Sequence, residues 1–528
     1  MLGSANPLPN TQGFRSLRQQ LPNAMADRRT FLRHALSAGA GLWLAPDLVL
    51  ADPYRPAFHL SASGLPGLGA PVRIRGRLTA GGRPVPGVAL SDGYDVTRTG
   101  ADGTYELLSS DRQRFVFMTV PAGYEIPVSS TGTAAFYQPI LANWAGEMAA
   151  DFALTPGRGP AGGASHAFLA VGDTQTQTRF EMARLHAESV PDMRRTVEHL
   201  GGRAAFGLAV GDIMFDDLSL YPDYEEAVRK VGLPFFQAVG NHDLDQDAGT
   251  DPDSVRTFER RFGPSYYSFD RGEVHYVVLD DVMWHASGYI GHIGAEQVAW
   301  LSRDLGLVEA GRTVVVFLHI PGMSKQEFRN GRSGASITTS VTNRELLYRM
   351  LEPFNAHLIS GHTHENEHVF EGGVHEHVLG TTCGAWWTDQ ICHDGTPNGY
   401  AVYEVSGSQV SWRYKSTDLP RSAQMRLYAA GSDPAFPTEI MANVWDWDPA
   451  WEVVWLEDGV QRGVLEPRIG LDPLAVARFD GPNVPSHRTW VQPAPTEHLL
   501  RADTTGASGS VVVQATDRFG RVYTSQLS

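Results

Sequence analysis

The sequence predicts an α/β core flanked on either side by β-rich regions. Three observations support this fold class. Over residues 165–410, apolar runs typical of strands alternate with amphipathic helical patterns. Over 70–155, and again over 411–528, the runs are short and many are bounded by glycine-containing turns. We therefore expect a small N-terminal β-sandwich, a central α/β domain and a β-rich C-terminal domain.

The composition is that of a folded protein with an acidic balance. With 528 residues, of which 42% are hydrophobic, the chain is long enough for about three domains. Its formal charge of −16 argues against nucleic-acid binding, which needs a basic surface. The two cysteines, Cys383 and Cys392, are too few for a cysteine zinc site or a disulfide scaffold. They can pair with each other or remain free thiols.

Residues 1–51 have the order of parts found in an export signal. The segment Asp27–Arg33 resembles a twin-arginine motif, an apolar stretch over 35–45 follows, and Val49-Leu50-Ala51 resembles a cleavage site. The alternative is an ordinary basic amphipathic helix. The apolar stretch is shorter than the ~20 residues that span a bilayer, and no later segment is long and apolar enough. We expect export to the periplasm or exterior of a bacterial cell.

The elements of each region follow from periodicity and turn residues. The segment Val72–Leu78 alternates apolar and polar residues, as a half-buried strand does. Residues 156–164 are rich in Gly, Pro and Ala and are expected to form a linker. The expected core strands are Ala167–Val171, Phe206–Val210, Phe235–Val239, Thr313–Leu318 and His357–Ser360, with helices over 179–200, 254–262 and 295–305 and a hairpin over 266–279. A final strand, Val511–Ala515, follows the small-residue run 506–509.

Each of the five core strands ends in polar residues at its C-terminal edge, where open α/β sheets place ligands. The clusters are Gly172-Asp173-Thr174-Gln175, Gly211-Asp212-Ile213-Met214-Phe215-Asp216, Gly240-Asn241-His242-Asp243, His319 and Gly361-His362-Thr363-His364. Because the C-termini of parallel strands lie side by side, we expect the clusters to converge on one crevice.

The residue types indicate metal chemistry. Carboxylate, imidazole and amide oxygen are ligands for divalent first-row metals. Seven such groups are too many for one ion, whereas two ions about 3.5–4 Å apart with a bridging carboxylate fit the count. His362 and His364 flank one residue, so in an extended segment both would point to one side.

The order of these motifs resembles the signature of the calcineurin-like metallophosphoesterases, over about 165–410. That resemblance implies the family's β-sandwich core flanked by helices. The N-terminal stretch 84–105 resembles the transthyretin-like module found beside some exported members. Residues 394–400, preceded by Trp386-Trp387, look typical of the same subgroup.

The resemblance implies a role for each site residue. The first metal would be held by Asp173, Gln175, Asp212 and His364. The second would be held by Asn241, His319 and His362, with Asp212 bridging. A hydroxide between the metals would attack phosphorus, and His242 would protonate the leaving group. Asp243 would orient His242, and Asp216 would hydrogen-bond a ligand or His242.

Gln175 departs from the wider family, which has His at this position. An amide oxygen is a weaker and harder ligand than imidazole, so the first site is shifted towards Mn²⁺, Fe²⁺, Mg²⁺ or Ca²⁺ and away from Zn²⁺. The subgroup carries the same Gln, which makes it a variant.

The sequence thus predicts an exported phosphomonoesterase or phosphodiesterase of undetermined oligomeric state. The rival is a non-catalytic, metal-stabilised protein that binds a glycan or an envelope partner. The remaining histidines of the core, among them His275, His368, His375 and His377, have no motif around them and are expected to be packing or surface residues. Trp386-Trp387 fits either a substrate-stacking wall or interdomain core. Lys325, Arg329 and Arg332 are expected mainly in a solvated loop.

Overall fold

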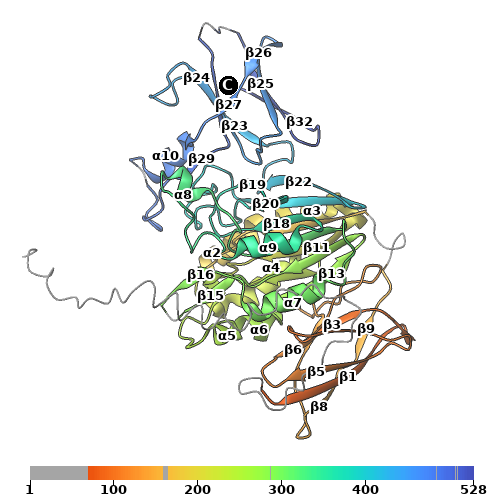
Figure 1. Cartoon of the computed structure of the whole chain (residues 1–528). Coiled ribbons are helices and arrows are strands. Elements are labelled where there is room, and N and C mark those ends of the chain that lie inside the picture. The colour runs from red at the N-terminus through yellow and green to blue at the C-terminus, as the bar shows by residue number, and fades with distance from the viewer. Residues whose placement is uncertain are drawn as a thin grey trace, which may run out of the picture. The chain divides into compact units, whose positions relative to one another are not determined.

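The computed structural model describes residues 69–157, 165–285, 287–482, 484–505, 507 and 509–527 (Figure 1). The expected export signal lies outside the described residues, as do residues 158–164 of the expected linker and residues 506 and 508. All described residues belong to one compact unit of the chain, Ala62–Ser528.

The N-terminal region forms the expected β-sandwich. In the first sheet, the long strand β1 (Pro71–Ala80) pairs with β2 (Arg83–Pro84), β5 (Thr104–Ser110), β8 (Glu147–Ala149) and β9 (Phe152–Leu154). The second sheet has the order β4 (Val96–Arg98), β3 (Ala89–Ser91), β6 (Phe115–Met118) and β7 (Tyr137–Pro139). Alternate residues of β1, Val72, Ile74 and Leu78, are buried, because successive side chains of a strand point to opposite faces.

The central region contains two larger sheets. One has the order β12 (Phe235–Ala238), β11 (Ala204–Val210), β10 (Ser165–Val171), β21 (Gly399–Ser406) and β22 (Gln409–Ser416). The other has the order β13 (Tyr267–Arg271), β14 (Val274–Val278), β17 (Thr313–Phe317), β18 (Asn355–Ser360), β20 (Val374–Val378) and β19 (Glu367–Glu371). Strands β10, β11 and β12 are parallel, and so are β14, β17, β18 and β20.

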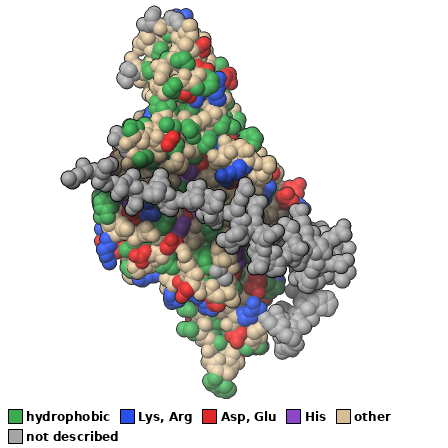
Figure 2. Space-filling view, turned by 90° about the vertical axis from the view of Figure 1, so that its left-hand side faces the viewer, with side chains coloured by type: hydrophobic (Ala, Val, Ile, Leu, Met, Phe, Trp, Pro, Cys, Tyr) green, Lys and Arg blue, Asp and Glu red, His purple; other side chains and the backbone are tan. Residues whose placement is uncertain are grey.

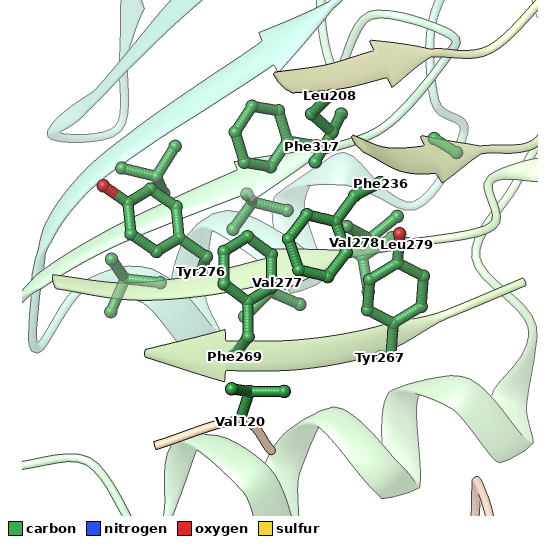
Figure 3. Packing of buried hydrophobic residues seen from close by; sticks show 14 of the residues in the cluster. Val120, Leu208, Phe236, Tyr267, Phe269, Tyr276, Val277, Val278, Leu279 and Phe317 are labelled. Carbon is green, nitrogen blue, oxygen red and sulfur yellow. The ribbon is translucent and has the colours of Figure 1, made fainter. Parts of the chain in front are cut away.

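Aromatic side chains from both sheets fill the space between them (Figure 3). Phe236 of the first sheet stacks on Phe269 of the second with ring centroids 4.0 Å apart. Phe206 likewise packs edge-on against Tyr276 at 5.2 Å. Burial of each such ring contributes roughly 1.5–3 kcal/mol, so this layer holds the two sheets face to face. The expected β-sandwich core is confirmed.

Helices cover the outer faces of the sandwich. They are α2 (Arg179–Arg184), α3 (Val190–Leu200), α4 (Tyr221–Val231), α5 (Asp251–Ser254), α6 (Arg256–Phe262), α7 (Ala295–Leu305) and α9 (Arg344–Leu351). The short helix α8 (Gln326–Arg329) instead lies against β29 (Pro495–Thr496) of the C-terminal region (Figure 1). The helix expected over 179–200 is confirmed as one continuous run, with a π-helical segment at Leu185–Ser189 between α2 and α3. A short hairpin, β15 (Val282–Trp284) and β16 (Tyr289–Gly291), follows the second sheet's β14.

One expectation about the core needs correction. The five strands that end in polar clusters do not lie in one parallel sheet: three belong to the first sheet and two, β17 and β18, belong to the second. Convergence therefore depends on the two sheets presenting their C-terminal strand ends at the same end of the sandwich.

The C-terminal region is β-rich, as expected. One sheet has the order β23 (Met425–Tyr428), β24 (Glu439–Val444), β30 (Leu499–Asp503) and β27 (Glu466–Pro467). The other has the order β26 (Val460–Val464), β25 (Glu452–Glu457), β31 (Val511–Thr516) and β32 (Val522–Gln526). A small pair, β28 (Gly470–Leu471) and β29 (Pro495–Thr496), and helix α10 (Pro473–Phe479) complete the region.

The surface mixes both signs of charge. On the face shown in Figure 2, Lys and Arg side chains are interspersed with Asp and Glu, and histidines are visible near mid-height. Among the described helices, none has the length and apolar character needed to cross a bilayer.

Candidate dimetal centre

All seven expected metal ligands lie at the ends of core strands. Asp173 and Gln175 follow β10, Asp212 follows β11 and Asn241 follows β12. His319 follows β17, and His362 and His364 follow β18. Every one of these side chains is buried except His362, which is partly exposed.

The backbone at these positions is strained. Asp173, Gln175, Asp212, His362 and His364 have positive φ angles of 36°, 40°, 46°, 73° and 56°. Residues other than glycine seldom adopt this region, at a cost of about 1–3 kcal/mol each. The expectation of an extended His362–His364 segment is therefore wrong: left-handed turns at both residues aim the two rings.

Glycines permit the close approach of the strand ends. A Cβ atom on Gly240 would lie 2.0 Å from the backbone nitrogen of Asp212, and one on Gly361 would lie 2.3 Å from Oδ2 of Asp173. Neither neighbour can move without displacing a ligand carboxylate. Glycine is needed at Gly240 because the Asp212 backbone approaches it, and at Gly361 because a ligand carboxylate does.

Asp212 joins the donors into one centre. Its Oδ1 lies 3.2 Å from Nε2 of His319, which in turn lies 3.1 Å from Oδ1 of Asn241 and 3.2 Å from Nδ1 of His362. Its Oδ2 accepts a hydrogen bond from Nε2 of Gln175 at 3.0 Å. The carboxylate of Asp212 thus contacts Gln175 of the expected first metal site and His319 of the expected second site, as a bridging ligand must.

The first group is completed by Asp173 and His364. Nε2 of His364 lies 3.6 Å from Oδ1 of Asp173. The backbone N–H of His362 donates to both oxygens of Asp173 at 3.1 Å, which fixes that carboxylate. The backbone of His362, a ligand of the second site, therefore contacts Asp173 of the first site, so the two sites are linked here as well as through Asp212.

Backbone carbonyls set the tautomer of each histidine. Nδ1 of His319 lies 2.9 Å from the carbonyl oxygen of Val210, Nε2 of His362 lies 2.8 Å from that of Thr338, and Nδ1 of His364 lies 3.0 Å from that of Gly384. A carbonyl oxygen only accepts, so each of these nitrogens carries the proton. Whenever such a ring is neutral, its other nitrogen presents a lone pair to the centre, the arrangement typical of metal-ligating histidine.

The electrostatics of the centre favour a bound cation. Burial lowers the pKa of His362 to about 3, so this ring is neutral. Burial alone would lower the pKa of His319, but the Asp212 carboxylate outweighs it and raises the pKa to about 10. Burial also raises the pKa of Asp173 to about 7. Positive charge is thus needed next to Asp212, and the donor set fits two divalent ions.

His242 lies beside this centre and is held by three contacts. Its Nδ1 lies 2.8 Å from Oδ1 of Asp216, and its ring stacks on Phe215 with centroids 4.2 Å apart. Its backbone N–H donates to Oδ1 of Asp212 at 2.9 Å. Burial lowers its pKa, but the charges of Asp212 and Asp216 outweigh burial, and the pKa is raised. The protonated ring is therefore favoured.

Asp243 has a different role from the one expected. Its carboxylate accepts hydrogen bonds from the backbone N–H groups of Ile213, Met214 and Gly240 and from the hydroxyl of Tyr221. These bonds tie the loop after β11 to the loop after β12. Among the described contacts, the carboxylate that holds the His242 ring belongs to Asp216.

The C-terminal region contributes residues near the centre that no sequence motif indicated. Nη2 of Arg488 donates to Oε1 of Glu181 at 2.9 Å, and its guanidinium carbon lies 4.4 Å from the centroid of Phe215. Trp490 packs edge-on against Trp386 at 4.7 Å, and Trp386 stacks on His364 at 4.0 Å. No motif surrounds Arg488 or Trp490, so local sequence offered no signal.

The other candidates are either buried in packing contacts or paired near the surface. The expectation of a solvated loop holds for Arg332, whose side chain is exposed, and is wrong for Arg329, which is buried. Trp387 is buried and donates to the carbonyl of Thr174. Arg329 is buried between Glu365 and Glu367, Lys325 pairs with Glu497, and Arg332 pairs with Glu327. Cys383 and Cys392 are buried free thiols. The four tryptophans of the C-terminal region, Trp445, Trp447, Trp451 and Trp455, are buried or pack against its core.

Comparison with known families agrees with this geometry. The model for "Calcineurin-like phosphoesterase" matches residues 166–366, and the models for the N terminal and the C terminal of that family match 72–157 and 376–523. The class that the fold and the site define is that of the calcineurin-like phosphoesterases. The chain belongs to the calcineurin-like phosphoesterase family, whose dimetal chemistry implies two divalent ions at this centre.

Curated relatives match the catalytic region. The chain is 28% identical over 204 residues to serine/threonine-protein phosphatase CPPED1 of Bos taurus and 25% identical over 205 residues to that of Homo sapiens. Each match covers 37% of this chain and 60% of the relative. The chain thus spans less than two thirds of the length of these relatives.

Solved structures resemble the chain more distantly. A dimetal phosphatase from Danio rerio is 13% identical, with 48% of this chain and 97% of that chain covered and a TM-score of 0.33. A purple acid phosphatase from yellow lupin seeds is 12% identical, with 60% and 56% covered and a TM-score of 0.36. The family assignment rests on the family models and not on these low scores.

Proposed function

We propose that the protein hydrolyses phosphoesters at this centre, with His242 as the general acid. The observation that carries the proposal is the position of the His242 ring. It is held by Asp216 and Phe215, and its backbone is bonded to Asp212, the carboxylate shared by both groups of metal donors. A scaffold protein would have no need of an oriented acid beside its metal ligands.

Each residue then has a defined task. The seven ligands, Asp173, Gln175, Asp212, Asn241, His319, His362 and His364, would hold two divalent ions, which lower the pKa of water and neutralise charge on phosphoryl oxygens. Nδ1 of His242 donates to Asp216, so Nε2 is free of that bond and delivers its proton to the leaving-group oxygen. Asp216 stabilises the protonated ring, and Asp243 keeps the two loops at a fixed distance.

The substrate class is proposed as an extracytoplasmic phosphoester. Because the curated relatives are named serine/threonine-protein phosphatases, phosphoserine and phosphothreonine peptides belong among the candidates. The amide ligand at Gln175 favours Mn²⁺, Fe²⁺, Mg²⁺ or Ca²⁺ over Zn²⁺.

The first experiment is metal-dependent turnover. The purified protein is stripped with chelator, reloaded with Mn²⁺, and assayed on p-nitrophenyl phosphate, bis-p-nitrophenyl phosphate and a phosphoserine peptide. Asp212→Asn and His242→Asn are tested beside His199→Asn, which changes an exposed histidine of α3 outside the centre. We expect turnover that needs metal and is lost on every substrate in Asp212→Asn. In His242→Asn it should fall most on the phosphoserine peptide, whose alkoxide leaving group needs a proton, and in His199→Asn it should be kept.

The ratio of rates on the three substrates identifies monoesterase, diesterase or phosphoprotein phosphatase activity. A metal-loaded protein that stays at background on all three would contradict the proposal. The non-catalytic binding function would then be tested next with glycans.

Export is proposed on the twin-arginine pair alone. The test is cell fractionation of a bacterial host that expresses the chain or the Arg28→Lys/Arg29→Lys variant. We expect the wild type in the periplasm or medium and the variant in the cytoplasm. An unchanged distribution would contradict the proposed export route.

A further inference from the structure

A second group of metal-type donors lies outside the dimetal centre. It consists of His368 on β19, His377 on β20 and Asp446, which follows β24 of the C-terminal region. Nε2 of His368 and Nε2 of His377 lie 3.0 and 3.5 Å from Oδ1 of Asp446. The three residues are only 3%, 0% and 2% exposed, and none belongs to the centre described above.

Strand register brings the two histidines together. His368 and His377 are directly opposite each other in the antiparallel pair β19–β20, so their side chains leave the same face of the sheet. Their rings stack with centroids 4.2 Å apart. The carboxylate of Asp446 is fixed from the other side, because its Oδ2 accepts from the backbone N–H of Tyr414 at 3.2 Å. Oδ1 is left to face the two rings.

A fourth oxygen donor completes the group. Oδ1 of Asn366 lies 2.9 Å from Nε2 of His377. The amide nitrogen of Asn366 donates to the carbonyl of Trp445, which determines that the oxygen, and not the nitrogen, faces His377. Nε2 of His377 thus has two oxygens within 3.5 Å, Oδ1 of Asn366 and Oδ1 of Asp446.

The outer nitrogen of each ring also has a partner. Nδ1 of His377 contacts the hydroxyl of Tyr403. Nδ1 of His368 lies 3.0 Å from Nε2 of His375, whose Nδ1 lies 3.1 Å from Nδ1 of His357. Each partner can accept a proton from Nδ1, which leaves both Nε2 atoms with lone pairs directed at Asp446. Support of this kind for the outer nitrogen is typical of histidine ligands.

The charges around Asp446 are unbalanced without a cation. Burial lowers the pKa of His368 to about 4 and that of His377 to about 3, so neither ring supplies positive charge at neutral pH. Burial raises the pKa of Asp446 to about 6. The nearby arginines form their ion pairs elsewhere, Arg518 with Asp448 at 2.6 Å and Arg521 with Asp517 at 2.5 Å. The charge of Arg521 lowers the pKa of Asp446, but burial outweighs it. A buried carboxylate in this setting is costly unless a cation joins it.

We propose that His368, His377, Asp446 and Asn366 bind one divalent transition-metal ion that fastens the C-terminal domain to the catalytic core. Ligand atoms around a tetrahedral ion with bonds of 2.0–2.1 Å are about 3.4 Å apart. The spacings of 2.9, 3.0 and 3.5 Å need only small changes to match. Two imidazoles with two oxygens suit Zn²⁺ or Co²⁺, and four protein ligands leave no open position for a substrate. The ion is structural and does not depend on the proposed hydrolysis.

The test counts metal ions in a protein whose dimetal centre is disabled. Asp212→Asn protein is stripped, loaded with Zn²⁺, passed through gel filtration and analysed by mass spectrometry for metal. We expect one bound Zn²⁺ per chain above any that remains at the dimetal centre. This ion should be lost from the double variants Asp212→Asn/Asp446→Asn and Asp212→Asn/His377→Gln. His357→Gln, two hydrogen bonds away from His368, is expected to keep the ion.

Two further readouts do not use activity. Loading with Co²⁺ should give the intense visible absorption of a four-coordinate site in Asp212→Asn protein but not in Asp212→Asn/Asp446→Asn protein. Chelator should lower the Tm of the former by several degrees more than that of the latter. Equal zinc content with and without Asp446, or no zinc bound by Asp212→Asn protein, would overturn the proposal. Asp446→Asn keeps the side-chain volume, and His377→Gln changes a different part of the chain. If one of these variants misfolds, the zinc content of the other still tests the proposal.

Discussion

Arg488 of the C-terminal region packs its guanidinium 4.4 Å from the ring centroid of Phe215, the residue that stacks on His242. Its charge is balanced by Glu181, which lies at the start of the catalytic domain in α2. The side chain of Arg488 is only 7% exposed. Arg488, more than 200 residues after Phe215 in the chain, thus supports the Phe215 ring, which stacks on the proposed general acid His242.

This relationship predicts that Arg488 is a positioning residue. Arg488→Ala removes one side of the support of Phe215, so the His242 ring samples orientations that cannot reach the leaving group. We expect kcat to fall about tenfold with little change in KM. The measurement is steady-state kinetics on the best substrate found.

The chain offers a matched control for that prediction. Arg468 lies 4.5 Å from the ring of Phe436 in the C-terminal region and has no contact with the centre. Arg468→Ala should leave kcat unchanged, and Arg488→Lys should recover only part of the loss because it lacks the planar group that stacks. An Arg488→Ala enzyme with wild-type kcat would show that Phe215 needs no such support.

The acid role of His242 predicts a dependence on the leaving group. A poor leaving group such as an alkoxide must be protonated as it departs, whereas p-nitrophenolate needs little help. We therefore expect His242→Asn to reduce kcat by about 10²–10⁴-fold on alkyl phosphates and much less on p-nitrophenyl phosphate. The measurement is a plot of log kcat against leaving-group pKa for wild type and variant.

Asp212→Asn separates this effect from loss of metal. Because Asp212 contacts both groups of donors, its loss should lower the rate on every substrate by a similar factor. Equal losses for good and poor leaving groups in His242→Asn would instead assign His242 to charge stabilisation.

Replacing Gln175 by histidine is expected to change the metal preference of the centre. Its amide nitrogen lies 3.0 Å from Oδ2 of Asp212. As a metal ligand the amide would present its neutral oxygen, which binds Zn²⁺ less tightly than imidazole does. Gln175→His is expected to raise Zn²⁺ affinity about tenfold and to lower the ratio of Mn²⁺- to Zn²⁺-supported turnover. Metal competition followed by activity assays measures both. Gln390→His, at an exposed position, should change neither.

The raised pKa of His275 makes the stability of the fold depend on pH. This buried ring lies 2.9 Å from both Asp270 and Asp304. Burial alone would lower its pKa, but the two carboxylates outweigh burial and raise it from 6.5 to about 10. Because the folded state binds the proton more tightly, the stabilisation is fully present below the unfolded pKa and is lost as pH rises towards the folded one.

We therefore expect His275→Gln to lower the free energy of unfolding by about 3 kcal/mol near neutral pH. The difference from wild type should shrink as the pH is raised to about 10. Denaturant unfolding at several pH values measures it. A difference that stays constant across that range would mean that packing of the ring, and not its charge, stabilises the fold.

The sequence by itself determined which residues are candidate metal ligands, because they lie in short motifs directly after strands. Asp173, Gln175, Asp212 and His319 could be placed from an apolar run and the polar residues that end it. Hydrophobic periodicity likewise predicted the strands, since it reflects which face is buried.

Only the tertiary structure decided which residues act together across long distances. It divided the five strands between two sheets, and it gave the His242 contact to Asp216 instead of Asp243. It also brought Arg488 to Phe215 and Asp446 to His368. These pairings depend on how domains and sheets pack, and packing is a property of surfaces assembled from many distant residues. A local pattern of residues therefore cannot predict these long-range pairings.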